Sequence, residues 1–380
     1  MIRQRLKLLA AAVGVALLAA LAGWVWLGAP KPSPSGTPPT PPATAQSNPA
    51  VAGASQPVKP GEAFGSALAA LKGARDSAAA RSSLAELRRA LAAMPAAAAS
   101  AAIRQFLDSK ADAATHQGFK IGGKGILNEA PSLRTFLLDY LGQIDPAGAA
   151  AYARVILSST DSPDEWAVAL RSLALGDTTP EAKALLEQKT GELLRNAAWQ
   201  QSPSTGYLEA FDVAVFLGGA DLVPALGDLV RRQDNPEVAH AAYLALDRLV
   251  INDPATLLTA LEASPGLMQG REATRADYFA RADVRDPQQR QALESYLLDP
   301  HRSGAELAQF AGVFPNANYM ISQNLLTPTP TPDHAALTGR DAASLQAVQQ
   351  WLADPRFANL QQPLLKVQQR LEDFARQAGR

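Results

Sequence analysis

The sequence predicts an all-α protein: a right-handed α-solenoid of paired helices with helical caps, preceded by a transmembrane helix and a disordered linker. Three observations favour this fold. Prolines recur at nearly regular intervals, and each opens a segment whose apolar residues follow the 3.6-residue period of a helix. Aromatic residues make up only 6% of the chain, whereas Ala and Leu are abundant, as close-packed helices require. Finally, helices this short cannot bury an apolar face alone, so they must pack on similar neighbours.

The first residues predict a membrane anchor. Residues 1–7 form a basic flank with Arg3, Arg5 and Lys7, and residues 8–28 are an unbroken apolar run. About 20 apolar residues can cross a bilayer, whereas the apolar part of a secretory signal is nearer 7–15 residues. The basic flank is expected to stay in the cytoplasm. We therefore predict a single-pass protein of the cell inner membrane with its body in the periplasm. A cleaved signal peptide is the alternative, and it also places the body outside the cytoplasm.

Residues 29–62 consist mainly of Pro, Ala, Ser, Thr and Gly, with almost no large apolar side chain. Such a segment cannot build a core and is predicted to be a disordered linker. At about 3.1 Å per residue in an extended polyproline form, it would reach on the order of 100 Å. This plan suits a body that works at a distance from its membrane.

Residues 63–117 contain three Ala-rich segments with helical spacing and are expected to form an N-terminal helical cap. Residues 118–130, GFKIGGKGILNEA, form a Gly-rich hairpin or loop. The glycines resemble those of a phosphate-binding loop, but the GK[ST] sequence is absent and no buried strand precedes them. A structural hairpin turning at Gly122-Gly123 is the plainer interpretation.

Residues 131–264 carry the regular pattern. Prolines 131, 163, 203 and 236 each open an apolar helix, at intervals of 32, 40 and 33 residues, and a second helix follows each one. Proline at the first helical position is tolerated because that amide has no intrahelical partner, and a preceding Ser or Asn caps the free donors. A repeat of this length predicts a solenoid of helix pairs.

One segment of this region, DNPEVAHAAYLALDRL, resembles a HEAT repeat, in which Asp-x-Pro-x-Val leads into an Ala-rich first helix. The matching residues are Asp234, Pro236, Val238, Ala241, Ala242, Ala245 and Leu246. Where the family often has Arg after the Val, this chain has Ala239. The other three pairs are similar in period and helix polarity. The resemblance covers residues 131–264 and implies a curved stack whose second helices line a partner-binding face; it implies no chemistry.

Residues 265–380 are predicted to form a C-terminal helical region, where the repeat pattern weakens. Helices are expected at 273–284, 286–299 and 303–316, and two more close the chain. Between these groups, NLLTPTPTPDHAALTG breaks the helical pattern with alternating Thr and Pro, which predicts an exposed extended loop.

No catalytic, metal-binding or cofactor-binding residue is predicted. The chain has no cysteine, and its 4 histidines are well apart, so neither thiol chemistry nor a recognisable zinc spacing is present. No serine occupies a G-x-S-x-G motif. The net charge of −1 gives no reason to expect nucleic acid as a partner. These observations favour a binding protein over an enzyme.

A few residues are candidates for contact with a protein partner. The polar run NAAWQQSPS contains an aromatic residue, a basic pair follows an apolar helix, and FPNANYM is either a packed corner or a docking loop. Positive charge is favoured at a helix end, so the basic pair also has a purely structural interpretation. The five candidates are Trp199, Arg231, Arg232, Phe314 and Tyr319.

Three hypotheses for function follow. The first is a membrane-anchored periplasmic scaffold or assembly factor that binds a protein of unknown identity. The second is a steric chaperone with the general plan of lipase foldases, although RADYFARAD from Arg275 to Asp283 lacks their signature. The third is a carbohydrate-active enzyme of the cell envelope that would use acids such as Asp277, Asp283 and Asp286.

Overall fold

A computed structural model describes residues 60–328, 331 and 333–378 of the chain. The predicted anchor at residues 8–28, and the linker up to residue 59, lie outside the described residues. The described part is mostly helical, as the predicted all-α class requires. No helix in this part combines the length and the apolar character that a bilayer-spanning segment needs.

Three Ala-rich helices open the described chain: α2 (Pro60–Gly73), α3 (Ser77–Ala92) and α4 (Ala96–Asp108). The first begins three residues before the predicted start of the cap. Phe64 of α2 stacks on Phe106 of α4, with 5.0 Å between ring centroids. The apolar face of α4 then continues onto the first repeat helix, so these helices share the core of the rest of the described chain.

The Gly-rich segment forms a two-stranded antiparallel hairpin of β1 (Lys120–Ile121) and β2 (Leu127–Glu129). Its turn is the short 3₁₀ helix η1 (Gly123–Gly125), in which Lys124 and Gly125 have positive φ angles of 59° and 72°. Glycine reaches this backbone region without steric penalty.

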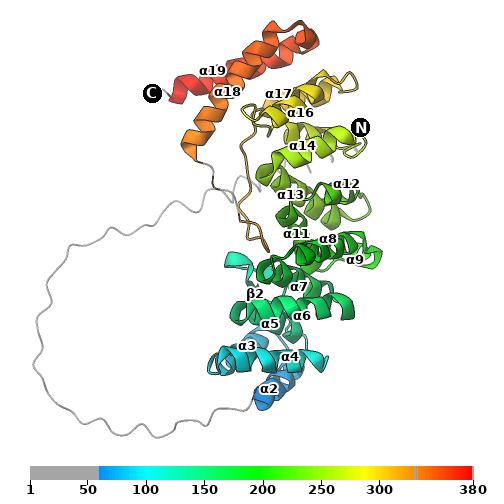
Figure 1. The fold of residues 1–380 in the computed structure, drawn as a ribbon, viewed down its shortest axis with the longest axis vertical. Helices are drawn as coiled ribbons and strands as arrows, with labels where there is room; N and C mark the ends of the chain where they lie inside the picture. The colour runs from blue at the N-terminus through cyan, green and yellow to red at the C-terminus, as the bar shows by residue number, and fades with distance from the viewer. Residues whose placement is uncertain (1–59, 329–330, 332, 379–380) are drawn as a thin grey trace, which may run out of the picture. The chain divides into compact units, whose positions relative to one another are not determined.

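Helix pairs follow, as Figure 1 shows. Three are regular: α5 (Leu133–Ile144) with α6 (Pro146–Ser159), α7 (Pro163–Gly176) with α8 (Pro180–Arg195), and α13 (Pro236–Asn252) with α14 (Pro254–Ala263). The remaining pair is broken into α10 (Thr205–Glu209), α11 (Asp212–Leu217), η2 (Ala220–Leu222) and α12 (Val223–Val230). A short extra helix, α9 (Ala197–Gln201), precedes it and accounts for the longer interval of the proline pattern.

Most of these helices begin with the predicted device of a capping side chain followed by proline. In each case a side-chain oxygen accepts a hydrogen bond from the amide three residues ahead; the caps are Asp145, Ser162, Thr179, Asn235 and Asp253. Each such cap is worth about 1 kcal/mol. The prediction is wrong for Pro131 and Pro203, which lie two residues before their helices. There Ser132 and Ser204 are the caps, so the helix begins after the serine.

Neighbouring pairs pack on one another as closely as the helices within a pair. The most extensive contacts among the repeats join α6 to α7 and α12 to α13. Buried apolar residues form a single cluster that extends from the first described helices to the last ones. This packing is compatible with a helical-repeat fold, in which each unit is stabilised mainly by its neighbours.

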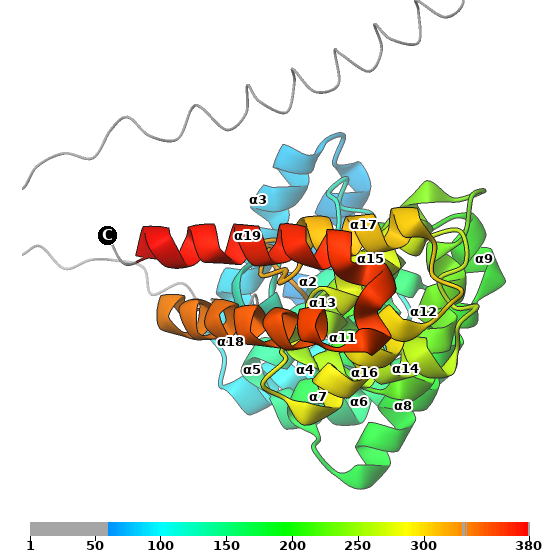
Figure 2. The ribbon, with the colours of Figure 1, turned by 90° about the horizontal axis from the view of Figure 1, so that it is seen from above.

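The C-terminal region continues the same core. It comprises α15 (Glu272–Phe279), α16 (Pro287–Leu298), α17 (Gly304–Val313), α18 (His334–Ala353), η3 (Pro355–Leu360) and α19 (Gln361–Ala378). Figure 2 shows α18 and α19 lying side by side. Successive rings 4.1 to 6.1 Å apart connect these elements: Phe279, Tyr296, Phe310, Phe314, Trp351 and Phe357.

The extended segment between α17 and α18 corrects one prediction. We call residues 315–328 the strap; Figure 1 shows it, in orange, running back past α13 toward the earlier helices. The Thr-Pro sequence predicts full exposure here, but Asn324, Leu325 and Thr327 are buried. Their burial is possible because the backbone amides of Leu326 and Thr327 donate to a buried carboxylate, which satisfies donors that would otherwise need water.

A charged contact between α6 and the end of α7 gives the first testable prediction. Asp177 accepts hydrogen bonds from the hydroxyl of Thr179, at 2.6 Å, from its amide, and from Arg154 at 2.7 Å. These bonds, the Thr179 hydroxyl first, lower the pKa of Asp177 from 3.8 to about 2. A lowered pKa means that the stabilisation is complete above the unfolded pKa and is lost as the pH falls toward 2. We expect Asp177→Asn to lower the urea midpoint at pH 6 and to have progressively less effect between pH 4 and pH 2. An effect that does not change over this range would contradict the assignment.

Candidate functional site

Buried ion pairs connect the first helices of successive pairs. Asp139 of α5 pairs with Arg171 of α7 at 2.7 Å. Further along the chain, Asp212 of α11 pairs with Arg248 of α13 at 3.3 Å. Asp247 of α13 pairs at 2.8 Å with Arg281, which follows α15. We call these six residues the charged ladder: Asp139, Arg171, Asp212, Arg248, Asp247 and Arg281.

The hairpin covers the first part of the charged ladder through its main chain. Arg171 donates to the carbonyl oxygen of Gly125, and the amide of Leu127 donates to Asp139 at 3.2 Å. Because both partners are main-chain groups, the ladder binds the hairpin by its backbone and not by its side chains.

The strap covers the second part in the same way. Asp212, which is fully buried, accepts hydrogen bonds from the amides of Leu326 and Thr327 at 2.7 and 2.8 Å, and from the Thr327 hydroxyl. Arg248 donates to the side-chain oxygen of Asn324 at 3.0 Å. Nearer α17, Arg281 donates to the carbonyl oxygen of Asn318. Charged side chains of the first helices therefore hold two extended segments, mainly through the main-chain groups of those segments and, in the strap, also through the side chains of Asn324 and Thr327.

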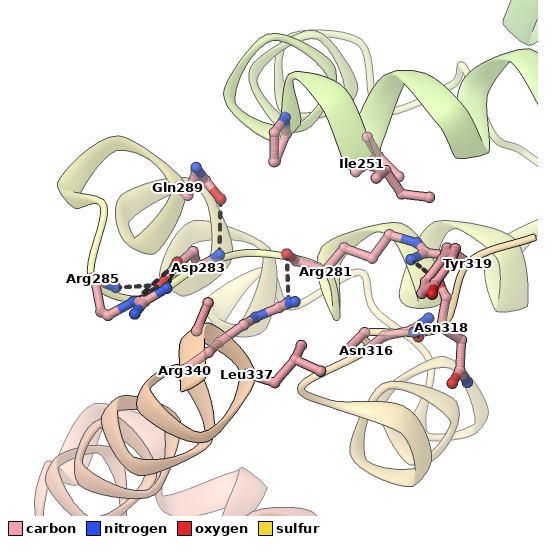
Figure 3. A pocket seen from close by; sticks show the side chains of 14 residues that line it. Ile251, Arg281, Asp283, Arg285, Gln289, Asn316, Asn318, Tyr319, Leu337 and Arg340 are labelled. Carbon is pink, nitrogen blue, oxygen red and sulfur yellow. Dashed lines mark hydrogen bonds and ion pairs between the residues drawn. The ribbon is translucent and has the colours of Figure 1, made fainter. Parts of the chain in front are cut away.

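A cavity of about 300 Å³ lies where the strap leaves α17. Its walls come from the end of α13, the α15–α16 loop, the strap and the first turns of α18 (Figure 3). The residues that give it its character are Ile251, Arg281, Arg285, Asn316, Tyr319 and Arg340.

Three arginines line this cavity, but they have different partners. Arg281 pairs with Asp247 at 2.8 Å, and Arg285 pairs with Asp283 at 2.6 Å. Arg340 instead donates to main-chain carbonyls at the end of α15, the shortest bond being 2.6 Å to Arg281. Burial lowers the pKa of the Arg340 guanidinium. The Nε–H groups of Arg281 and Arg340 are buried and have no acceptor among the described residues.

Beside the cavity, the strap exposes apolar side chains. Ile321 is 84% exposed and Met320 is 54% exposed, and Tyr319 next to them lines the cavity. The chain carrying them is held on both sides, at Asn318 by Arg281 and at Asn324 by Arg248. The strap therefore holds two neighbouring apolar side chains in contact with solvent.

The structure places the five sequence candidates in two separate regions. Trp199 of α9 is half-buried and lies edge-on to Trp166, at 5.2 Å, and to Tyr207, at 6.2 Å. Arg232 pairs with Asp234 and donates to Gln200 of α9, the short helix that carries Trp199. It also lines a second cavity, of about 420 Å³, together with side chains of α13 and α15. The exposed Arg231 pairs with Asp228.

The other two candidates, Phe314 and Tyr319, lie in FPNANYM, which the sequence leaves as either a packed corner or a docking loop. Phe314 is fully buried and stacks on Phe310 at 4.9 Å, so its end of the segment is a packed corner. Tyr319 is half-buried at the cavity wall, beside the exposed Met320 and Ile321. Only the Tyr319 end of the segment therefore fits the docking-loop interpretation.

The acids named for an enzymatic hypothesis each have a structural partner. Asp277 accepts from Gln309, Asp283 binds Arg285, and Asp286 caps α16. Over the described ranges, no group of three or more His, Asp or Glu side chains is placed to hold a metal ion.

Sequence reasoning missed the charged ladder, although the sequence contains a signal for it. A charged residue stands in the middle of several apolar first helices: FLLDYLG, VALRSLAL, AFDVAVF and LALDRLV. Charges in such surroundings are buried only when they are paired. Arg340 was missed because it lies in a polar helix whose packing cannot be read locally.

Comparisons with protein-family models, with curated proteins and with solved structures found no match to this chain.

Proposed function

We propose that this protein is a non-catalytic scaffold or assembly factor of the cell envelope that binds another protein. In this proposal, residues 8–28 anchor it in the inner membrane, and residues 29–62 link the anchor to a periplasmic body. The body is a right-handed α-solenoid of HEAT-like pairs. The observation that carries the proposal is the exposed apolar segment Tyr319–Met320–Ile321, which the strap presents beside an arginine-lined cavity.

The energetics of this segment favour binding. Leaving large apolar side chains in water forfeits about 25 cal/mol for each Å² that a partner would cover. The strap is already held by Arg281 and Arg248, so much of the conformational entropy that a flexible loop would lose on binding is lost during folding. Such preorganisation raises affinity without new contacts.

The polar surroundings add specificity. Guanidinium and amide groups line the cavity next to the apolar segment, and an apolar centre with a polar rim is the usual composition of a protein interface. Arginine, tyrosine and other aromatic residues are also enriched among the side chains that dominate binding energies. A polypeptide with apolar and acidic side chains fits this surface best.

Site-specific photocrosslinking in cells tests the proposal. A photoreactive amino acid at position 321 of the full-length protein is expected to capture one dominant envelope protein. Phe374, an apolar residue of α19 that is 43% exposed, is the matched control position and should capture only background. In a second experiment the probe is at position 320 and the protein carries Ile321→Asp. This substitution should reduce capture about tenfold or more, because it places a charge in an apolar contact.

A third probe position tests whether the partner binds the strap or the second helices of the pairs. Val155 is 47% exposed and belongs to α6, one of the second helices that the HEAT resemblance assigns to partner binding. Capture from position 155 but not from 321 would keep the scaffold function and move its binding surface. Capture from neither position would overturn the proposal.

A further inference from the structure

The arginine-lined cavity carries more positive charge than its own carboxylates neutralise. Arg281 and Arg285 each have an aspartate partner, whereas Arg340 makes no ion pair with a described carboxylate. The nearby carboxylates of Asp283 and Asp341 form no ion pair with Arg340. The walls therefore contain one guanidinium that no ion pair between described residues neutralises.

The main-chain partners of Arg340 compensate this charge only in part. The three carbonyls it contacts belong to Ala280, Arg281 and Ala282, directly after α15. The C-terminal end of a helix carries a partial negative charge of about half a unit, which is less than the charge of a guanidinium. In addition, the buried Nε–H groups of Arg281 and Arg340 have no acceptor among the described residues. A buried donor without an acceptor destabilises the protein.

From these groups we infer that the cavity is a binding site for a carboxylate, supplied by the polypeptide that docks on the strap. A carboxylate matches the planar fork of a guanidinium in geometry. Its single negative charge would supply the ion pair that Arg340 lacks. The apolar side chains of Ile251 and Leu337 and the amide of Asn316 suit the carbon chain and the polar edge of an acidic residue.

The position of the cavity supports this source of the carboxylate. Tyr319 lines the cavity and directly precedes the exposed Met320 and Ile321. Tyr319 and Arg340 line the same cavity, so a chain lying on this segment would place a side chain at the wall that Arg340 shares. This inference rests on the proposed function, because it assigns the carboxylate to the docked partner.

The first test measures the site without any partner. Purified full-length protein in detergent is titrated with sodium glutamate by calorimetry, at constant ionic strength, with sodium phosphate as the comparison ion. We expect saturable glutamate binding that Arg340→Gln weakens about tenfold or more and that Arg340→Lys partly restores. Arg356→Gln is the matched control, because Arg356 is an exposed arginine with its own partner Asp354, and it should bind as the wild type does. Circular dichroism confirms that each variant is folded.

The second test repeats the crosslinking from position 321 in the Arg340→Gln protein. Loss of capture together with loss of glutamate binding supports the full inference. Loss of glutamate binding with undiminished capture would overturn the assignment to the partner and leave a site for a free carboxylate. If the wild type binds no glutamate, or if Arg340→Gln binds it as well as the wild type, the site itself is overturned. Absence of capture from both positions 321 and 155 in the wild type, with glutamate binding intact, would instead contradict the proposed function.

Discussion

Replacing Asp212 with alanine is expected to release the strap and to lower the free energy of unfolding by about 3–5 kcal/mol, the usual effect of removing one partner of a buried ion pair. The carboxylate is fully buried and is shared between Arg248 and the main chain of Leu326 and Thr327. Its removal leaves Arg248 and two amide donors without this acceptor, and the cost of these unsatisfied donors is part of that loss.

Hydrogen exchange followed by mass spectrometry locates this effect, and urea denaturation measures its size. Peptides that contain Leu326 and Thr327 should exchange much faster in Asp212→Ala than in the wild type. Asp228→Ala is the matched control, because Asp228 forms an exposed pair with Arg231, and such pairs contribute about 1 kcal/mol or less. Unchanged protection of the strap in Asp212→Ala would show that Asp212 does not hold it.

The helices could largely be predicted from the sequence, because the signals that set them are local. Proline after a capping residue marks the start of α7 and α13, and an apolar face at the helical period marks their length. The prediction fails by two residues for α5, because its capping residue, Ser132, follows the proline instead of preceding it and the helix begins at Leu133.

The strap could not be predicted, because its stability comes from contacts distant in sequence. Thr327 binds Asp212 across 115 residues, and no local pattern specifies that pairing. Thr and Pro in alternation exclude a helix but do not distinguish an exposed chain from one whose amides bind a buried carboxylate.

The candidate contact residues illustrate the same limit. Phe314 and Tyr319 lie in one short aromatic segment, but only the structure shows that the first is fully buried and that the second lines a cavity. Composition identifies an aromatic residue in a non-helical segment, whereas its exposure depends on what packs against it. Here Phe310 and Trp351 cover Phe314.

Contact between the strap and the hairpin leads to the second large expected effect. Gly125 has a φ angle of +72°, and a Cβ atom there would lie 2.0 Å from the carbonyl oxygen of Leu325. A side chain in this backbone region is unfavourable by roughly 1–2 kcal/mol, and overpacking a buried site typically adds about 1–3 kcal/mol. We therefore expect Gly125→Ala to lower the free energy of unfolding by about 2–5 kcal/mol and to expose Leu325 to exchange.

Gly123→Ala separates this effect from a general weakening of the hairpin. Gly123 belongs to the same turn, but a Cβ atom there would meet nothing within 4 Å, so alanine should change the stability by less than about 1 kcal/mol. If the two alanine variants are equally stable, the hairpin and the strap do not support each other. If only Gly125→Ala exposes the strap, then the hairpin near the start of the repeats and the strap near their end are coupled. The apolar segment at Ile321 would then be positioned by groups from both ends of the repeat region.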